Sequence, residues 1–495
     1  MMRSPAPTIT MLLAWLLLLH TGSLLALAQP AEKEGTCAWN DVSCYQDPHL
    51  KEITVDLGTG TNETFLAYHP SDVSTFYQEE PGSRQAKVPS FHGQFGKFIN
   101  LSPNPIIIYW SSGRKHNDVY IAEAAAFEAA ATATFPGHKF LVRSKTDDDS
   151  ADLQMWTITA KQVLYTYDPF EDGTLKLTDL KPDQLELYNL QKNNLKFAEQ
   201  YKAATGVDYL SLYPRRPRPT NPMWAADYFG QQHSVMTRET HFTELPNPEN
   251  LVPLKPGGVH EPMLKAHREE DTLNMTMTVL SCAPRVFEIK NFLSKVEIDH
   301  IMQIATGMTL HQSSTKAGLE GESRHDESTR TSRNSWVVRG KSPIIDAIYR
   351  RSADLMQVNE AYMRKRSNDE MPHLKTKGSN SEQLQLVHYD VGQQYTPHHD
   401  FAIPSLVDGQ PMRFATILFY LNEGMGGGAT TFPKWRNAEH TSELKVVPEV
   451  GKAVLFYSLL PDGNMDELSQ HAAQPVSDGE KWLINLWTWD PMMRF

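Results

Sequence analysis

The chain has 495 residues, of which 40% are hydrophobic and 21% charged, and its formal net charge is -12 at pH 7. This length exceeds what one hydrophobic core ordinarily supports, so we expect two or three domains. The composition is typical of a folded soluble protein, and the acidic balance argues against a nucleic-acid binder, which would present a basic face.

The N-terminus carries a targeting segment. Arg3 precedes a long apolar run that ends in Ala-Leu-Ala at 26–28, an order typical of a secretory signal peptide covering residues 1–28. Because the run approaches membrane-spanning length, a signal anchor is the alternative. In either case we expect the remaining chain to face the lumen of the endoplasmic reticulum and secretory pathway. It would be attached to a membrane only if this segment stays uncleaved.

Two further features fit a secretory destination. Three Asn-x-Ser/Thr sequons predict glycosylation at Asn62, Asn100 and Asn274. Of the three cysteines, Cys37 and Cys44 are close enough in the chain to form a disulfide in an oxidising compartment. So few cysteines cannot be the main stabilising framework of so long a chain, and the hydrophobic cores must hold the fold together.

Residues 85–170 are predicted to form a β-rich module of unknown role. Apolar and β-branched runs such as PIIIYW, HKFLVR and MWTITAKQVLYTY are bounded by Gly, Pro or Asp clusters, as strands usually are. Between them, the alanine-rich tract 122–135 favours helix by propensity. The next segment, 171–278, is expected to hold a helix near 179–202, which stops at Gly206, and then a proline-rich linker.

The last segment, 279–495, has a more regular order of two helices and then several strands. Ser294 and Glu297 form a capping box before the first helix, and Pro343 suits the first turn of the second. The runs LQLVHY, RFATILFYLN, AVLFYSLL and KWLINLWTW predict strands. This order indicates an α+β architecture in which helices pack against a β-sandwich or jelly roll.

The stretch HYDVGQQYTPHHD contains two His-x-Asp pairs, His388 with Asp390 and His398 with Asp400. Residues i and i+2 of a strand share a face, so either pair could offer an imidazole and a carboxylate to one metal. A further histidine, His471, precedes another predicted strand. Two histidines and one carboxylate on a β scaffold form the facial triad of non-haem Fe(II) oxygenases, which leaves coordination positions open.

Lys481 stands at the start of the apolar run KWLINLW. A lysine that enters a jelly-roll interior implies a buried anion as its partner, because an isolated buried ammonium is costly. A zinc hydrolase could also use two histidines and an aspartate. It would have no evident need for this lysine.

Several motifs strongly resemble the catalytic domain of the prolyl 4-hydroxylases, namely HYDVGQQYTPHHDF, RFATILFYLN, GGATTFP, KAVLFYSLLPDG and LSQHAAQPVSDGEKWLINLW. The resemblance extends back to VLSCAPRVFEIKNFLSKVEIDHI, so it covers roughly residues 279–490. Enzymes of this family are dioxygenases of the endoplasmic reticulum built on a double-stranded β-helix. The resemblance therefore implies this jelly roll, with Fe(II), 2-oxoglutarate as cosubstrate, L-ascorbate, and a proline-rich polypeptide as substrate.

The resemblance also implies which residues bind the metal. In the family the iron-binding pair follows a GQ-x-Y-x-P turn, which makes the ligands His398 and Asp400, with His471 as the third. His388 then has a structural role, and His399 points to the opposite face.

For the cosubstrate, the resemblance implicates Tyr389, Thr430 and Lys481, the last on the distal carboxylate. A lysine at that position, where lysyl hydroxylases have arginine, favours the prolyl branch. Peptide contacts are implied for Arg330, Ser332, Tyr395, Arg413 and Trp487.

The chain departs from the collagen-type enzymes in two ways. They carry a histidine eight residues after the lysine, where this chain has Trp489, so assistance at the C1 end of the cosubstrate is absent or supplied otherwise. Residues 30–270 do not resemble their helical peptide-binding domain, which argues against collagen as substrate and against an obligatory disulfide-isomerase subunit. Two alternatives stay open: a 2-oxoglutarate dioxygenase acting on a different substrate, and a non-catalytic jelly-roll binding glycoprotein.

Overall fold

The computed structural model describes most of the chain after its N-terminal segment. The described residues are 47, 49–56, 62–69, 93–113, 118–146, 151–211, 218–246, 272–313, 315–316, 323–324, 329–367, 369–371, 377–401, 412–435 and 443–490. The predicted signal segment 1–28 and the predicted pairing of Cys37 with Cys44 lie outside these residues.

The N-terminal β-rich module is a sandwich of two sheets with strand orders β6-β3-β9 and β5-β4-β7-β8. Phe98, Phe140 and Trp156 belong to one buried cluster to which both sheets contribute. Its strands are β3 (Gln94–Asn100), β4 (Ile106–Trp110), β5 (Val119–Ala124), β6 (Ala129–Thr134), β7 (Lys139–Ser144), β8 (Gln154–Thr157) and β9 (Leu164–Tyr167).

The alanine-rich tract that favours helix by propensity forms strands β5 and β6. Strand β5 pairs with β4 and strand β6 pairs with β3, both antiparallel. Alternate small side chains such as Ala122, Ala124 and Ala130 are buried in the sandwich core. Pairing and burial thus outweigh the helix propensity of alanine, which is a weak preference.

A helix and a hairpin are joined to the sandwich through a shared buried cluster. Helix α2 (Pro182–Thr205) starts with proline in its first turn and ends at Gly206, whose φ of 74° is the left-handed conformation that glycine adopts easily. The hairpin pairs β1 (Leu50–Asp56) with β2 (Asn62–Tyr68). Phe65 of the hairpin and Phe197 of the helix share a buried cluster with Ile99 of β3.

The C-terminal part is built on a nine-stranded sheet with the order β10-β11-β12-β23-β19-β26-β17-β16-β13. Its strands are β10 (Gln232–Thr237), β11 (Leu273–Cys282), β12 (Arg285–Ile289), β13 (His311–Gln312), β16 (Arg333–Val337), β17 (Leu384–Tyr389), β19 (Arg413–Tyr420), β23 (Ala453–Tyr457) and β26 (Lys481–Trp489). The four predicted strand runs all lie in this sheet.

The sheet begins earlier than the predicted boundary at residue 279. Strand β10 comes from the segment predicted as a linker, and β11 starts at Leu273. Buried side chains such as Val235, Met275 and Met277 attach these strands to the core. Their short alternating pattern is easily missed among the prolines and polar residues around it.

A smaller sheet with the order β18-β24-β21-β22 completes the jelly roll. Leu418 of the large sheet and Phe432 of the small one belong to the same buried cluster, so the two sheets share a core. The remaining strands are β18 (Tyr395–His398), β21 (Thr430–Phe432), β22 (Leu444–Val446) and β24 (His471–Ala473), the pair β20 (Gly426–Gly427) and β25 (Val476–Asp478), and the pair β14 (Thr315–Lys316) and β15 (Ser323–Arg324).

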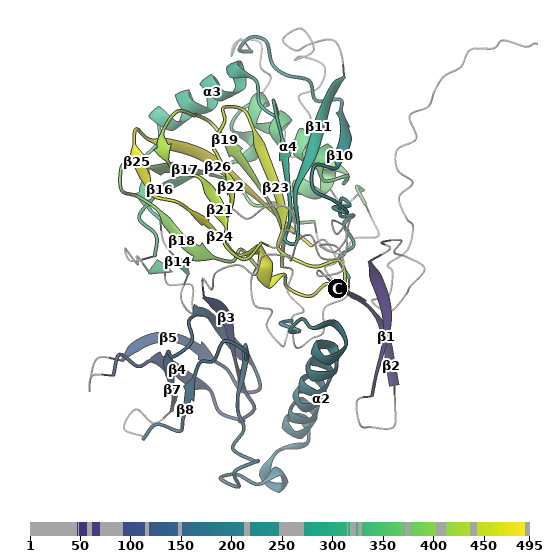
Figure 1. Ribbon diagram of the computed structural model, residues 1–495, viewed down its shortest axis with the longest axis vertical. Helices are drawn as coiled ribbons and strands as arrows, with labels where there is room; N and C mark the ends of the chain where they lie inside the picture. Colours follow the sequence, from purple (N-terminus) through teal and green to yellow (C-terminus); the bar gives the residue numbers. More distant parts are fainter. Residues whose placement is uncertain are drawn as a thin grey trace, which may run out of the picture. The chain divides into compact units, whose positions relative to one another are not determined.

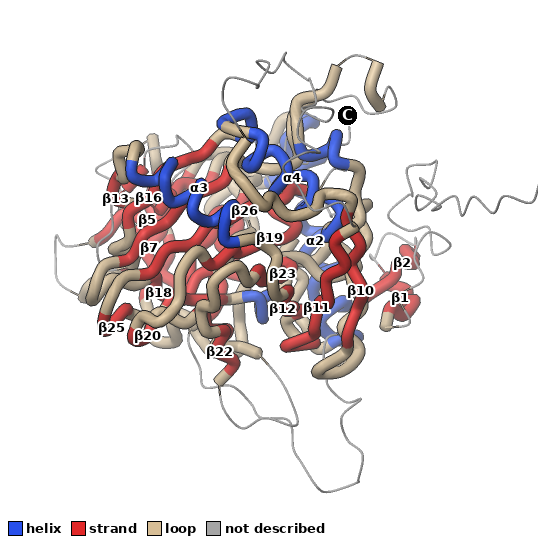
Figure 2. The backbone as a smooth tube through the Cα atoms, turned by 90° about the horizontal axis from the view of Figure 1, so that it is seen from above, coloured by secondary structure: helices blue, strands red, loops and turns tan. Residues whose placement is uncertain are grey.

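Helices α3 (Lys295–Thr306) and α4 (Pro343–Leu355) pack along the large sheet (Figures 1 and 2). Ile301 and Ile348 share a cluster with Ile417 of β19, whereas the next residue of that strand, Leu418, joins the core between the sheets. The chain also has short 3-10 helices, η3 (Leu177–Asp179), η7 (Arg339–Lys341), η8 (Glu360–Met363) and η9 (Glu467–Ser469).

This architecture confirms the predicted fold class, an α+β chain with a C-terminal jelly roll, packed helices and a smaller β-rich module before it. The predicted capping box is formed as well, because the Ser294 side chain accepts from Glu297 N–H and the Glu297 carboxylate accepts from Ser294 N–H. None of the helices in the described residues has the length and apolar character needed to cross a membrane.

Candidate metal centre

Three predicted ligands, His398, Asp400 and His471, come together in the jelly roll. One ligand atom from each lies within 4.8 Å of the others, and within the described part of the chain this is the one group of His, Cys, Asp or Glu side chains that could hold a metal. His398 ends β18 and His471 begins β24, and the two are direct partners in the antiparallel ladder. Pairing of two strands distant in sequence therefore assembles the group.

Both histidines are oriented by backbone carbonyls two residues before them. His398 Nδ1 lies 2.8 Å from Thr396 O, and His471 Nδ1 lies 3.0 Å from Ser469 O. A carbonyl only accepts, so each Nδ1 donates and each Nε2 keeps a lone pair for a metal. Burial, helped by His471, holds the pKa of His398 well below its ordinary value, which favours the neutral form that binds metals.

Asp400 is held as a carboxylate. Burial alone would raise its pKa, but His471, His398 and Arg413 together hold that pKa well below its usual range. Its Oδ2 accepts hydrogen bonds from Thr416 Oγ1 at 2.7 Å and from Trp487 Nε1 at 2.9 Å. Two imidazoles and one carboxylate are the donor set that suits Fe(II) with open coordination positions.

Lys481 is a buried amine that lacks a hydrogen-bond partner among the described residues. Its Nζ lies 5.4 Å from the ring centre of Tyr389 and 5.6 Å from that of Tyr420. Burial lowers the pKa of this amine from 10.5 to about 7. An unpaired buried ammonium is unfavourable, so the site is suited to a ligand that brings a carboxylate, as 2-oxoglutarate does.

The strand around Thr430 borders the same space. Tyr420 donates its hydroxyl to Thr430 Oγ1 at 2.8 Å. Gly427 has a φ of +70°, and a Cβ there would lie 2.3 Å from Pro475 O. A Cβ on Gly428 would lie 3.4 Å from Lys481 Cδ. The two glycines therefore let the chain approach β25 and the lysine closely, which explains this part of the GGATTFP motif.

Three of the predicted peptide contacts form a stack that reaches the metal ligands. The ring of Tyr395 stacks on His398 with centroids 3.5 Å apart, and the guanidinium of Arg330 lies 4.6 Å from the Tyr395 ring centre. Arg330 Nε donates to Ser332 Oγ at 3.2 Å. Ser332 is fully buried and donates to Ser313 Oγ. A peptide contact by Ser332 stays a prediction, since the hydroxyl faces inward in this conformation.

The other two predicted contacts belong to a network around Glu382. Arg413 makes two hydrogen bonds to that carboxylate, at 2.6 and 3.1 Å, and its guanidinium lies 3.9 Å from the ring centre of Trp487. Trp489, which stands where a histidine was expected, donates its indole N–H to Glu382 at 3.0 Å. The Trp489 indole thus joins the ion pair of Glu382 and Arg413. Through Trp487, which lies under Arg413 and donates to Asp400, this network reaches the metal ligands.

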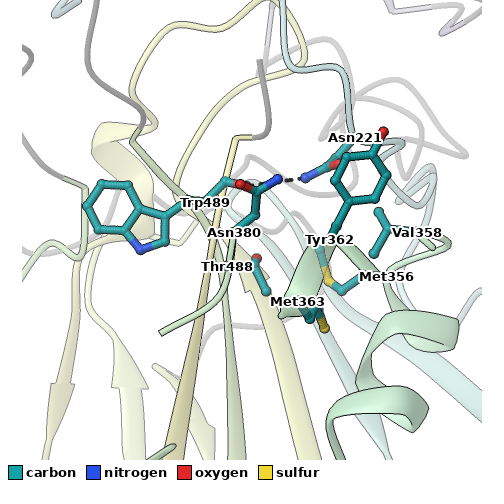
Figure 3. Close-up of a pocket in the computed structure, with 8 residues that line it drawn as sticks. All are labelled: Asn221, Met356, Val358, Tyr362, Met363, Asn380, Thr488 and Trp489. Atoms are coloured by element: carbon teal, nitrogen blue, oxygen red, sulfur yellow. Dashed lines mark hydrogen bonds between the residues drawn. The ribbon is translucent and has the colours of Figure 1, made fainter. Parts of the chain in front are cut away.

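A small cavity lies beside Trp489 (Figure 3). The ring of Trp489 points away from the other lining side chains, and its carbonyl accepts from Asn221 Nδ2 at 3.5 Å. No metal ligand and no predicted cosubstrate contact borders the cavity, so it is separate from the metal centre. The lining residues are Asn221, Met356, Val358, Tyr362, Met363, Asn380, Thr488 and Trp489.

The two other histidines of the stretch HYDVGQQYTPHHD, His388 and His399, do not join the metal group. His388 Nε2 lies 2.8 Å from a Glu480 carboxylate oxygen, and its ring packs against Trp482. The side chain of His399 is buried, and its Nε2 donates to Glu467 O at 3.1 Å. The choice between the two His-x-Asp pairs therefore falls on the second pair.

One predicted glycosylation site is wrong. Asn100 is fully buried, and its amide nitrogen donates to the carbonyls of Asn104, Ala124 and Ala125. A glycan on that nitrogen would have no room in this fold. Asn62 and Asn274 are exposed on strands, so they stay predictions.

Sequence reasoning missed three polar residues of the site, Thr416, Tyr420 and Gln385. Gln385 accepts from Arg330 at 3.4 Å and from Asn485 at 3.0 Å. Thr416 and Tyr420 are four residues apart in RFATILFYLN and so share one face of their strand. A polar group repeated on one face of an apolar strand is the signal that could have found both.

Comparison with known proteins gives consistent matches. The model of the 2OG-Fe(II) oxygenase superfamily matches residues 384–489. Probable prolyl 4-hydroxylase 3 of Arabidopsis thaliana is 33% identical over 224 residues, which are 42% of this chain and 70% of the relative. Prolyl 4-hydroxylase subunit alpha-1 of Gallus gallus is 31% identical over 217 residues, which are 41% of this chain and 35% of the relative.

Among solved structures, the viral collagen prolyl hydroxylase of Paramecium bursaria Chlorella virus-1, in a complex with 2-oxoglutarate, covers 41% of this chain and 95% of its own. It is 24% identical, with a TM-score of 0.30.

Proposed function

The chain belongs to the prolyl 4-hydroxylases, which are 2-oxoglutarate- and Fe(II)-dependent dioxygenases, and on that basis we propose that it converts peptidyl proline to 4-hydroxyproline in proline-rich proteins of the secretory pathway. The overall reaction consumes O2 and 2-oxoglutarate and releases succinate and CO2. The observation that carries the proposal is the combination of the grouped His398, Asp400 and His471 with the buried amine of Lys481, which lacks a hydrogen-bond partner among the described residues.

The residues divide the work between metal and cosubstrate. His398, Asp400 and His471 would hold the iron, which supplies the activation of O2 that hydroxylates an unactivated carbon. Lys481 would pair with the distal carboxylate of 2-oxoglutarate. Its position inside the jelly roll, against the rings of Tyr389 and Tyr420, excludes water from that carboxylate.

Hydrogen bonds from its surroundings orient the Asp400 carboxylate, a metal ligand, before any substrate binds. Thr416 and Trp487 both donate to Oδ2, so the carboxylate has little freedom to rotate. Because Trp487 also lies under the guanidinium of Arg413, the peptide side and the metal side of the site share one indole. A bound proline-rich chain, which has few backbone donors, would suit such aromatic and guanidinium surfaces.

The cellular setting is part of the proposal. The apolar N-terminal segment and the exposed sequon at Asn62 support entry into the secretory pathway. L-Ascorbate is expected as the reductant that restores iron oxidised in turnovers without substrate. The lack of resemblance between residues 30–270 and the peptide-binding domain of the collagen enzymes supports an enzyme that acts without a disulfide-isomerase subunit.

Succinate release from 2-oxoglutarate tests the reaction and the substrate class together. Purified protein with Fe(II) and ascorbate would be assayed alone, with poly-proline, with a Ser-Pro repeat peptide, and with free proline. Peptide-stimulated release is expected. Release that no peptide stimulates would favour a different substrate, and no release from folded, metal-loaded protein would favour the binding glycoprotein.

A further inference from the structure

We propose that the N-terminal half of the chain is a positioning element of the metal centre, because it holds the segment 458–470, here called the His471 loop, that leads into His471. The inference rests on the proposed function for the identity of the metal. The geometry would apply to any divalent ion held by the same three ligands.

The tip of the His471 loop is anchored by a buried carboxylate. Asp462 Oδ2 accepts the backbone N–H of Tyr68 in β2 at 2.9 Å and the hydroxyl of Tyr201 in α2 at 2.6 Å. Asp462 Oδ1 accepts the N–H of Asn464 at 2.9 Å, which closes the turn. Strand β2 and helix α2 of the N-terminal half therefore both donate hydrogen bonds to one side chain of the loop.

The next anchor is Asn464, which is fully buried. Its Oδ1 accepts the N–H of Leu210 at 2.9 Å, and its Nδ2 donates to Asp208 O at 2.9 Å. The carbonyl of Leu210 in turn accepts from the buried amine of Lys97, at 2.5 Å. The segment after α2 and strand β3 of the sandwich are thus fastened to the same loop.

The third anchor, Glu467, lies four residues before His471. Its Oε1 accepts the N–H of Phe95 in β3 at 3.0 Å. Its backbone carbonyl accepts from His399, and the ring of Phe95 packs edge-on against His399, with centroids 5.9 Å apart, and against Phe401, with centroids 5.1 Å apart. His399 and Phe401 are the chain neighbours of the ligand Asp400, so β3 reaches the surroundings of two ligands.

The loop transmits this placement directly to the third ligand. Ser469 N–H and Oγ both donate to Asp466 O, which fixes the end of the loop. The Ser469 carbonyl then accepts from His471 Nδ1 and so sets the orientation of the imidazole. Groups that orient a metal-bound histidine influence metal affinity strongly. Moving the loop would also break several buried hydrogen bonds at once, which is unfavourable.

The test compares two tyrosines of α2 that each donate a hydroxyl to a carboxylate. Tyr201→Phe removes the bond to Asp462 in the His471 loop, whereas Tyr188→Phe removes a bond to Asp168, at 3.1 Å, inside the N-terminal half. Co(II) binding, followed by its visible absorption, reports ligand geometry without turnover. We expect Tyr201→Phe to weaken Co(II) binding about three- to ten-fold and to alter the spectrum, and Tyr188→Phe to do neither.

Asp462→Asn is the partner variant. Its effect on Co(II) affinity should combine with that of Tyr201→Phe less than additively, since both variants disrupt the same hydrogen bond between Tyr201 and Asp462. Equal Co(II) affinity and spectrum in wild type and Tyr201→Phe would overturn the proposal. None of these readouts needs 2-oxoglutarate or peptide, so failure of the succinate assay would leave the inference standing.

A measurement on the unaltered protein covers the case in which the variants do not fold. Coupling between two sites is reciprocal, so metal bound at His471 should slow hydrogen exchange of the amides that hold the loop. We expect slower exchange at Tyr68, Phe95 and Leu210 on adding Co(II). Unchanged exchange at all three amides would overturn the proposal.

Discussion

Replacing Lys481 by methionine separates a binding role of its amine from a structural one. The two roles predict changes of opposite sign in the free energy of unfolding of the protein without ligands. Methionine has a similar length and no charge, so it can occupy the space beside Tyr389 and Tyr420. If the amine serves the cosubstrate, its removal should stabilise the protein without ligands and weaken cosubstrate binding. If the amine serves the fold, its removal should destabilise the protein and leave binding unchanged.

The size of each effect follows from burial and charge. Burial lowers the pKa of Lys481 from 10.5 to about 7. At about 1.36 kcal/mol for each pKa unit, that difference corresponds to roughly 5 kcal/mol opposing an unpaired charge. We expect Lys481→Met to raise the free energy of unfolding by about 1–3 kcal/mol. The gain is smaller than the full cost of the charge because the surroundings of the lysine relax. Losing a buried charge pair removes about 2–5 kcal/mol from binding, so KM for 2-oxoglutarate should rise at least about 30-fold.

The assay is thermal unfolding without ligands together with KM for 2-oxoglutarate. Lys97 provides a control for stability, since burial also lowers its pKa to about 7 but its amine donates to Leu210 O. Lys97→Met should lower the melting temperature, because it leaves a buried carbonyl unpaired. A lower melting temperature for Lys481→Met, with an unchanged KM, would refute the reasoning.

Four other outcomes are expected. Because binding of the cosubstrate takes up a proton once the Lys481 amine is neutral above its pKa of about 7, affinity measured by titration should fall about five-fold from pH 7 to pH 8 and stay flat below pH 6. Thr416→Val removes a hydrogen bond to Asp400 and should weaken Fe(II) binding about ten-fold, as measured by metal titration. Trp489→Phe removes the hydrogen bond to Glu382 and should raise KM for the peptide about five-fold, with KM for 2-oxoglutarate unchanged. Asn100→Gln should lower the melting temperature of the protein expressed in a secretory host without changing the mass of any glycan it carries.

The elements that sequence reasoning placed well are those whose pattern is local. The capping residues before α3, the proline that opens α4 and the apolar strand runs each carry their signal within a few residues. The metal ligands needed the family resemblance, because the pair His388 and Asp390 has the same spacing as His398 and Asp400. Only the ladder that places His398 opposite His471 distinguishes them physically.

What sequence reasoning missed depends on long-range pairing. The alanine-rich tract became strands because β3 and β4 offer it partners, which no local propensity reports. Asn100 lies in a sequon, yet its side-chain amide is buried and donates to the carbonyls of Asn104, Ala124 and Ala125. The role of Asp462 is invisible in the chain, since its donors Tyr68 and Tyr201 are hundreds of residues away.

Analysis of the peptide product tests the central claim most directly. A proline-rich peptide would be incubated with the protein, Fe(II), ascorbate and 2-oxoglutarate, then hydrolysed and analysed for 4-hydroxyproline, with His471→Ala as the control. We predict 4-hydroxyproline in equal amount to the peptide-dependent succinate, and none from His471→Ala. Succinate without hydroxyproline, or equal hydroxyproline from His471→Ala, would contradict the assignment of this site.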